Sequence, residues 1–154
     1  MKQPQKNDSL LPVLENINQA DRVYCLTLES DIKKTDRIKF DAKLNQLVYW
    51  LNDYCYGKQF KKSNKRINII GGFEVGSMCE MPHYHLVLYH EKEMEKSYQE
   101  LNAFIRKSWY KLLEAKGSIM GSLVKFEPAD NNEAWFNYSL KEVNPRNFET
   151  LLWL

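Results

Sequence analysis

The chain has 154 residues, of which 44% are hydrophobic and 27% are charged, and its formal net charge is +2. This composition is typical of a globular domain with a buried core, and so small a net charge does not by itself indicate a nucleic-acid partner. No apolar run approaches the length of a membrane span, the N-terminus is polar, and the three cysteines show no paired spacing. We therefore expect a cytoplasmic protein with reduced thiols, and neither a membrane protein nor a disulfide scaffold.

The N-terminal segment, residues 1–20, contains two prolines, several asparagines and glutamines, and only weak periodicity. These features predict a loosely ordered arm in front of a single domain at 21–154. The domain begins with an alternation of polar and apolar residues at 22–29, which predicts a first strand.

A long helix is predicted next, because apolar side chains recur at helical spacing at Phe40, Leu44, Leu47, Leu51 and Tyr54. Thr35 or Asp36 can cap its first turn, and Gly57 is placed to end it. The connection that follows, 58–66, is polar and basic.

Two β-rich segments, 67–75 and 82–90, are predicted to be strands, and the six residues 76–81 between them suit a loop that joins antiparallel neighbours. A second helix is expected to end near Gly117, because one apolar stripe contains Met94, Tyr98, Leu101, Ile105, Trp109 and Leu112.

The last predicted elements are a strand at 118–127 and a short helix, capped by Asn131 or Asn132 and ending before Pro145. The order of elements is strand, helix, strand, strand, helix, strand, helix. It predicts an α+β, ferredoxin-like sandwich, in which helices pack on one face of an antiparallel sheet and the other face is free for a site.

Two histidines lie in the strand predicted at 82–90. His83 and His85 point the same way, because side chains alternate along a strand, and their Cα atoms are roughly 6.6 Å apart. If the strand at 67–75 pairs with this one, Glu74 comes close to both, and the set suits Mg²⁺ or Mn²⁺. Glu80, in the loop, is the rival carboxylate, and alternation sends His90 to the opposite face. Without a metal, the pair would be solvent-facing or hydrogen-bonded histidines.

A tyrosine on the last predicted helix is a candidate nucleophile. Nine tyrosines occur in the chain, but Tyr138 lies on a short helix with a polar cap, and Lys141 falls on the same face at i+3. Since the pKa of a phenol is about 10, an ammonium group and a metal-polarised phosphate would both help a tyrosine to attack. The alternative is an ordinary amphipathic surface pair.

Three short motifs follow one another in an order that resembles the HUH endonucleases. The histidine motif HYH at 83–85 is similar to the His-hydrophobic-His motif of that family, and YSLK at 138–141 is similar to the Tyr-x-x-Lys motif of its rolling-circle replication initiators. The segment CLTLE at 25–29 also resembles the first motif of the family. Together the motifs span roughly residues 22–141.

The resemblance implies a five-stranded antiparallel sheet with both histidines on a central strand. It implies that Glu74 is the third metal ligand, that Tyr138 is the nucleophile, and that Lys141 positions the tyrosine or neutralises charge on the phosphate. The activity implied is metal-dependent, site-specific nicking and joining of single-stranded DNA through a 5′-phosphotyrosine. The partners implied are single-stranded DNA or an origin hairpin, a separate helicase and a host polymerase.

Other functions remain open at the level of sequence. Relaxases place the tyrosine before the histidine motif, where the candidate here is Tyr24 within the first strand. Single-tyrosine HUH transposases place it after the motif, as this chain does. A catalytically vestigial DNA-binding module is a further alternative, and two histidines with one carboxylate also occur in non-haem iron enzymes.

A basic cluster in the connection after the first helix is a candidate DNA-binding surface. It combines several cations with one aromatic ring that could stack on a base, whereas the alternative is a solvated basic loop. The cluster consists of Lys58, Phe60, Lys61, Lys62, Lys65 and Arg66.

Overall fold

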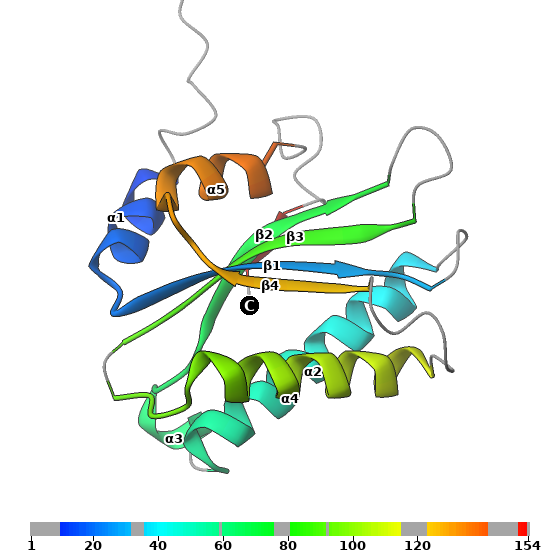
Figure 1. Ribbon diagram of the computed structural model, residues 1–154, viewed down its shortest axis with the longest axis horizontal. Coiled ribbons are helices and arrows are strands. Elements are labelled where there is room, and N and C mark those ends of the chain that lie inside the picture. Colours follow the sequence, from blue (N-terminus) through cyan, green and yellow to red (C-terminus); the bar gives the residue numbers. More distant parts are fainter. Residues whose placement is uncertain are drawn as a thin grey trace, which may run out of the picture.

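The computed structural model describes residues 10–31, 36–58, 60–75, 81–91, 93–114, 123–141 and 151–153. One sheet lies between two helical layers, with α1 and α5 above it and α2 and α4 below it in the view of Figure 1. Within these residues, no helix is long and apolar enough to cross a membrane.

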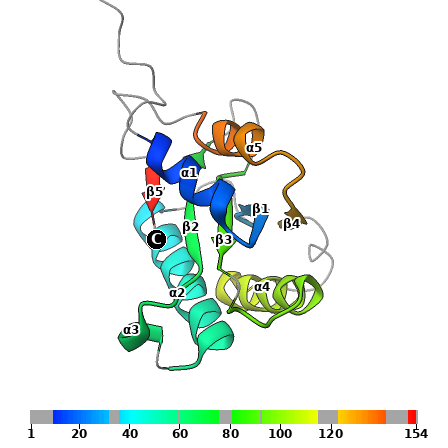
Figure 2. The same cartoon turned by 90° about the vertical axis from the view of Figure 1, so that its left-hand side faces the viewer.

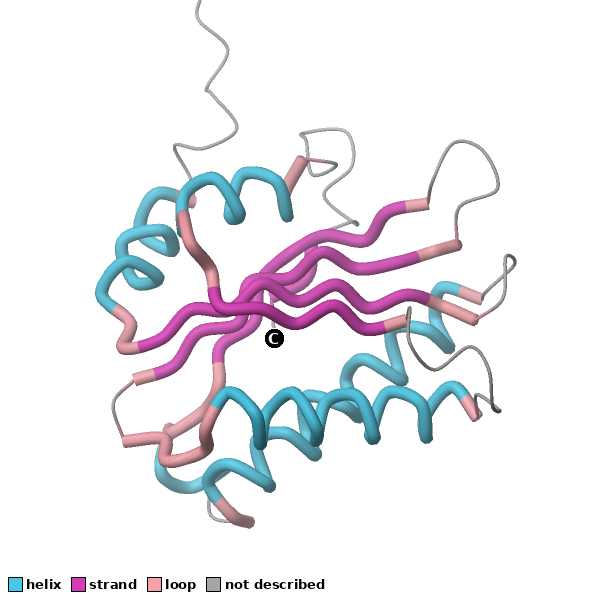
Figure 3. Tube along the Cα trace, in the orientation of Figure 1, coloured by secondary structure: helices cyan, strands magenta, loops and turns pink. Residues whose placement is uncertain are grey.

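The sheet has five strands in the order β4-β1-β3-β2-β5, and every neighbouring pair is antiparallel (Figure 3). The strands are β1 (Arg22–Glu29), β2 (Asn68–Glu74), β3 (His83–His90), β4 (Val124–Pro128) and β5 (Leu151–Trp153). The strand that carries both histidines, β3, therefore lies in the middle of the sheet. Two flanking strands hold it along its length, which gives the histidines a rigid base.

Two long helices cover one face of the sheet: α2 (Arg37–Tyr56) and α4 (Tyr98–Leu113). The Asp36 carboxylate begins α2 by accepting hydrogen bonds from the first free backbone N–H groups, and Gly57, with φ of 72°, ends it. A capping box, in which Ser97 and Glu100 bond each other's backbone N–H groups, begins α4. Apolar side chains from both helices and from the sheet fill the space between them and form the main core.

The opposite face is only partly covered, by α1 (Leu11–Gln19) and α5 (Asn132–Ser139), which pack against each other (Figure 2). Their buried side chains form a second, smaller core with apolar residues of the sheet: Leu10, Val13, Ile17, Ile70, Val87, Tyr89, Phe136 and Leu140. Beyond this core, polar residues of β1, β3 and β4 face the same side.

Strand pairing arranges the polar residues of this face in rows. In one row Glu74, His83 and Glu29 are neighbours across β2, β3 and β1. In the next row His85 lies opposite Thr27, and Thr27 lies opposite Lys125 of β4. Directly opposite residues in an antiparallel pair bring their side chains within contact distance, so the residues of one row can act together in a site.

The main predictions about the fold are confirmed. The protein is α+β with helices on an antiparallel sheet, compatible with a ferredoxin-like sandwich, and β1 and the capped helix α2 lie where the pattern predicted them. Tyr84, between the two histidines, points to the opposite face and stacks on Phe40 at 4.5 Å between ring centroids, as strand alternation requires. The predicted loop at 76–81, Gly117 and Pro145 fall, apart from Met81, outside the described residues.

Two expectations need correction. Residues 11–19 belong to a helix and not to an arm: Val13 and Ile17, one turn apart, are buried against the sheet, and this short apolar stripe was hidden by the polar residues around it. Residues 1–9 lie outside the described part of the chain. The second face of the sheet is not wholly free either, because α1 and α5 cover part of it.

Candidate metal and tyrosine site

Three potential metal ligands meet where β2 ends and β3 begins. Their ligand atoms all lie within 4.8 Å of one another. Glu74 Oε2 is 3.5 Å from His83 Nε2 and 3.2 Å from His85 Nε2, and the two Nε2 atoms are 3.0 Å apart. The register of β2 and β3 brings this about, because it places Glu74 directly opposite His83.

Hydrogen bonds to the Nδ1 atoms, on the side away from Glu74, fix the ring orientation of both histidines. His83 Nδ1 lies 2.8 Å from the carbonyl oxygen of Met81; since a carbonyl only accepts, this nitrogen donates, which in a neutral imidazole leaves the lone pair on Nε2. His85 Nδ1 lies 3.2 Å from the Thr27 hydroxyl. Outer hydrogen bonds of this kind fix the tautomer of metal-binding histidines and aim the free nitrogen at the ion.

The charge state of the site also suits a cation. Burial, reinforced by the neighbouring His83, lowers the pKa of His85 to about 4, so its ring is neutral at neutral pH, as metal ligation requires. Glu74 Oε2 is buried between the two imidazoles and the Lys141 ammonium. Two imidazoles and one carboxylate are thus a group that could bind a metal ion.

Tyr138 lies beside this group. Its ring centroid is 4.7 Å from that of His85, and the residue is 43% exposed, so its phenol is accessible from solvent. Helix α5 holds it there by two contacts: Phe136 is buried in the small core, and the Trp135 indole N–H donates to the backbone oxygen of Leu86, 2.8 Å away.

Lys141 links the tyrosine to the carboxylate. Its Nζ lies 3.1 Å from Glu74 Oε2 and 4.4 Å from the centre of the Tyr138 ring. Desolvation alone would lower the pKa of Lys141, but the hydrogen bond and charge of Glu74, with a contribution from Tyr138, raise the pKa overall. The ammonium is therefore charged at neutral pH.

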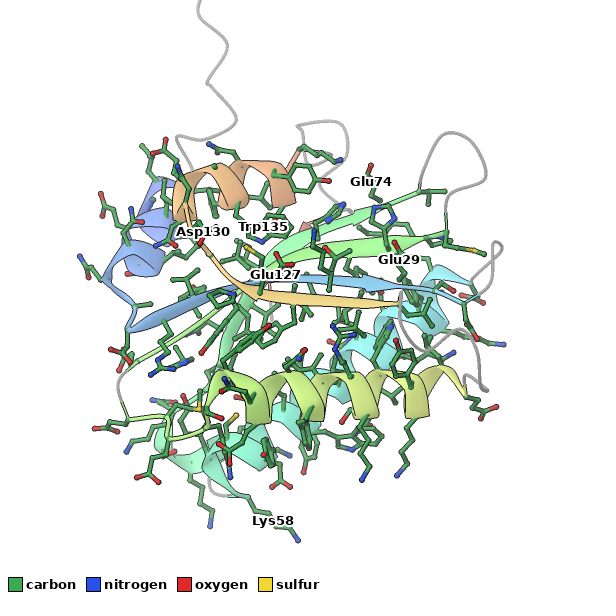
Figure 4. All side chains as sticks on the ribbon, viewed as in Figure 1. Glu29, Lys58, Glu74, Glu127, Asp130 and Trp135 are labelled. Atoms are coloured by element: carbon green, nitrogen blue, oxygen red, sulfur yellow. The ribbon has the colours of Figure 1, made fainter. Side chains whose placement is uncertain are left out.

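A cavity of about 420 Å³ opens at this place, lined by Glu29, Glu74, Met81, His83, His85, Tyr138 and Lys141. Glu29 and Thr27 are site residues that sequence reasoning did not assign a role. The signal that could have found them is strand alternation in β1: both belong to the face that pairs with the histidines. Figure 4 shows Glu29 and Glu74 at the same end of the sheet.

The predicted basic cluster is not brought to this site. Lys58 lies beyond the opposite helical layer in Figure 4, far from Glu74, and α3 (Phe60–Ser63) is a single turn after α2. Phe60 is buried and packs against Tyr49 in an edge-to-face arrangement. We had expected its ring to stack on a base, but in this position it is not accessible for stacking. Lys65 forms an ion pair with Glu93.

Other sequence candidates also lie elsewhere. His90 is buried on the face of the sheet that α2 and α4 cover, opposite His83 and His85, as strand alternation predicts. Tyr24, the upstream tyrosine, is buried on that same face and stacks on Tyr98, so it cannot reach the histidine pair. Glu80 falls outside the described residues, and among those residues the carboxylate whose oxygen lies within ligand distance of both histidines is Glu74.

One end of the sheet thus gathers two imidazoles, two carboxylates, a phenol and an ammonium. No protein-family model and no curated protein sequence matches this chain. What indicates a function is therefore the chemistry that these side chains can perform together.

Proposed function

We propose that the protein is a metal-dependent enzyme that nicks and rejoins single-stranded DNA, with Tyr138 as its nucleophile. The observation that carries this proposal is the position of the exposed Tyr138 phenol against His85, in the cavity that also contains Glu74 and His83. A metal group beside a tyrosine and a lysine suits the transfer of a phosphoryl group to the phenol. The motif order supports the type found in rolling-circle replication initiators.

Glu74, His83 and His85 would hold a divalent cation, Mg²⁺ or Mn²⁺, with positions left for a phosphate. Such an ion, when bound, polarises the phosphate and makes its phosphorus more open to attack. The two histidines are well prepared for ligation, since Met81 and Thr27 hold their outer nitrogens and the depressed pKa keeps His85 neutral.

Tyr138 then attacks the phosphorus. Its phenolic oxygen forms a new bond to the 5′ phosphate and loses its proton, while the bond to the 3′ oxygen breaks and that oxygen takes up a proton. The Lys141 ammonium, held between Glu74 and the Tyr138 ring, offsets negative charge as it develops on the phosphate. Glu29, which lines the same cavity, supplies a carboxylate that can accept a proton.

The product is a 5′-phosphotyrosine and a free 3′-OH that a polymerase can extend. A phosphotyrosine diester keeps the energy of the original bond, so a later 3′-OH can attack it, release Tyr138 and rejoin the strand. The same chemistry would serve a single-tyrosine transposase. A non-haem iron function is less favoured, since a phenol paired with a lysine lines the cavity beside the metal group.

A denaturing gel tests the proposal. Purified protein is incubated with Mn²⁺ and a labelled single-stranded DNA library of randomised sequence, and SDS-resistant protein–DNA species are counted. We expect adducts with the wild type, none with Tyr138→Phe, and undiminished adducts with Tyr49→Phe. Tyr49 is a matched control because it is 42% exposed and lies on the other helical layer.

Mass spectrometry of the trapped species should place the nucleotide on the peptide that contains Tyr138. An adduct formed by Tyr138→Phe would move the nucleophile to another residue. Cleavage without any adduct would indicate instead a metal nuclease that uses water.

A further inference from the structure

A second cavity, of about 470 Å³, shares His85 and Tyr138 with the site and extends from them under α5 towards β4. This volume lies within the range of about 300–1,000 Å³ that is usual for small-molecule sites. Figure 4 shows that Glu127, Asp130 and Trp135 gather between the sheet and α5, at some distance from Glu74. The cavity begins at the reacting groups and leads away from the metal ligands.

The rows of the sheet divide this cavity into two levels. Thr27 and Lys125 share the row of His85, and Lys125 lines the cavity, so its cationic side chain belongs to the level nearest the metal group. Cys25 and Glu127 share the next row, two residues along each strand and roughly 6.6 Å further from the metal group. Along the cavity, the level with the positively charged Lys125 is therefore followed by the level with the negatively charged Glu127.

The walls of the second level combine an aromatic ring with hydrogen-bond acceptors. The Trp135 ring is half-buried and held in place by its bond to Leu86, with its centroid 5.2 Å from that of Tyr138. The exposed carboxylates of Glu127 and Asp130 line the other side. A flat apolar wall and converging acceptors suit a flat ring whose edge donates hydrogen bonds.

A metal ion is a poor occupant for the second level. Among the residues that the structure describes, the group of three or more metal-ligating side chains is Glu74, His83 and His85, and Cys25, Glu127 and Asp130 form no such group. Burial, with the charges of Glu127 and Asp130, also raises the pKa of Cys25 to about 11, so its sulfur is a neutral thiol at neutral pH and a weak ligand.

We propose that this cavity binds the nucleobase next to the scissile phosphate and selects a base with an exocyclic amino group, such as cytosine, over thymine. This inference rests on the proposed function for the nature of the substrate. Carboxylates accept hydrogen bonds from the amino group of cytosine, whereas the carbonyl oxygen that thymine presents at the same position would face them without a proton between. Glu127 is the specificity-determining residue, and Lys125 holds the phosphate of the same nucleotide.

The test compares the binding of dCMP, dUMP and dTMP in the presence of Mg²⁺. The nucleotides dCMP and dUMP have the same sugar and phosphate, and differ on the base at the amino position. Binding is followed by NMR through the Trp135 indole N–H signal, which Trp135→Phe identifies. We expect dCMP to bind about tenfold more tightly than dUMP or dTMP.

Glu127→Gln removes the charge and keeps the size of the side chain. It should abolish the preference for dCMP, alone or together with Asp130→Asn, whereas Glu133→Gln, which changes an exposed carboxylate of α5 outside the cavity, should leave the preference unchanged. Equal affinities in the wild type, or a preference that survives in the double variant, would overturn the proposal.

These outcomes are separate from those of the nicking test, because nucleotide binding requires no bond to break. A preference for dCMP without any covalent adduct would sustain the cavity as a nucleotide site and reject the nicking activity. Covalent adducts without any base preference would support the nicking activity and reject the cavity as a base-selective site.

Discussion

At the scale of single residues, the site is defined by three potential ligand atoms that lie close together. The Nε2 atoms of His83 and His85 are 3.0 Å apart, and the buried Glu74 Oε2 lies 3.5 Å and 3.2 Å from them and 3.1 Å from the Lys141 ammonium. Imidazole nitrogens and a carboxylate oxygen are suitable ligands for a divalent cation. One cation could be bound by all three atoms at once.

The first prediction concerns that cation. Mn²⁺ at about 100 times its Kd should stabilise the wild type by roughly 2.7 kcal/mol, which raises Tm by about 5–10 °C for a chain of this size. His85→Ala should lose this rise because it removes one of the ligands. Differential scanning fluorimetry with and without Mn²⁺ measures it.

His90→Asn is the matched control for this measurement. Its side chain lies on the opposite face, so the variant should keep the rise even if its own Tm is lower. A wild type that gains no stability from Mn²⁺ would contradict the assignment of the metal group.

A second prediction at this scale concerns Lys141. Lys141→Ala should slow adduct formation by about tenfold to a hundredfold without preventing it, because a partly exposed ammonium stabilises charge but forms no bond. Single-turnover rates give the effect, and Lys141→Arg should recover part of it. If Lys141→Ala reacts at the wild-type rate, the ion pair with Glu74 is merely structural.

At the scale of secondary structure, α5 positions the nucleophile by its attachment to the central strand. The Asn131 side chain caps the helix, and the Trp135 indole binds the backbone of Leu86, the residue after His85. Strand β2 also packs closely against β3 beside His85: a Cβ atom on Gly71 would lie 2.0 Å from the backbone oxygen of His85. Only glycine fits there without moving the metal-binding strand.

The prediction for this element is that Trp135→Phe separates metal binding from reaction. The lost hydrogen bond is worth about 0.5–1.5 kcal/mol, so Tm should fall by only a few degrees, and the Mn²⁺-induced rise should remain. Adduct formation should fall at least tenfold, because α5 no longer holds Tyr138 in place.

Trp50→Phe, on the other helical layer, is the control and should leave the rate unchanged. An unaltered rate in Trp135→Phe would mean that the rest of α5 holds the tyrosine without the indole bond.

At the scale of the whole molecule, one face of the sheet carries the main core and the other carries the candidate site. The face under α2 and α4 carries the larger core and gives most of the stability. The other face has a small core under α1 and α5, and keeps its remaining surface polar. A site built on a central strand gains rigidity from a core that it does not itself occupy.

The stability of the main core should depend on pH in the alkaline range. Burial raises the pKa of Cys55 to about 12 and that of Tyr56 to about 12, and burial with the bond to Asp41 raises the pKa of Tyr84 further. The unfolded chain loses these protons from about pH 9–10, whereas the folded chain keeps them. Folding stability is therefore complete below about pH 9 and is lost progressively as the pH rises towards 12.

Thermal melts between pH 7 and 11 measure this decline, and Tm should fall by several degrees per pH unit above pH 9–10. Cys55→Ala removes one of the groups, and should make the decline less steep although its Tm at pH 7 is lower. A Tm that stays constant to pH 11 would show that these groups ionise in the folded state.

Sequence periodicity determined much of the architecture. Alternation in 22–29, the β-rich run at 82–90 and the apolar stripe of α2 each reflect one-dimensional rules, so they could be predicted without the fold. The same alternation placed His83 and His85 on one face and His90 on the other. The short stripe of α1 was missed because only two buried residues mark it, and β5 because three residues carry no recognisable period.

Only the tertiary structure decided which distant residues meet. The register of β3 with β1 brought Thr27 and Glu29 to the histidines, and a shift by one residue would have turned both away. The packing of α5 on β3 brought Tyr138 to His85 across more than 50 positions of sequence, and left Lys58, which follows α2, on the other layer. Periodicity determines the face on which a side chain lies, whereas its partners depend on pairing and packing between segments that no local pattern records.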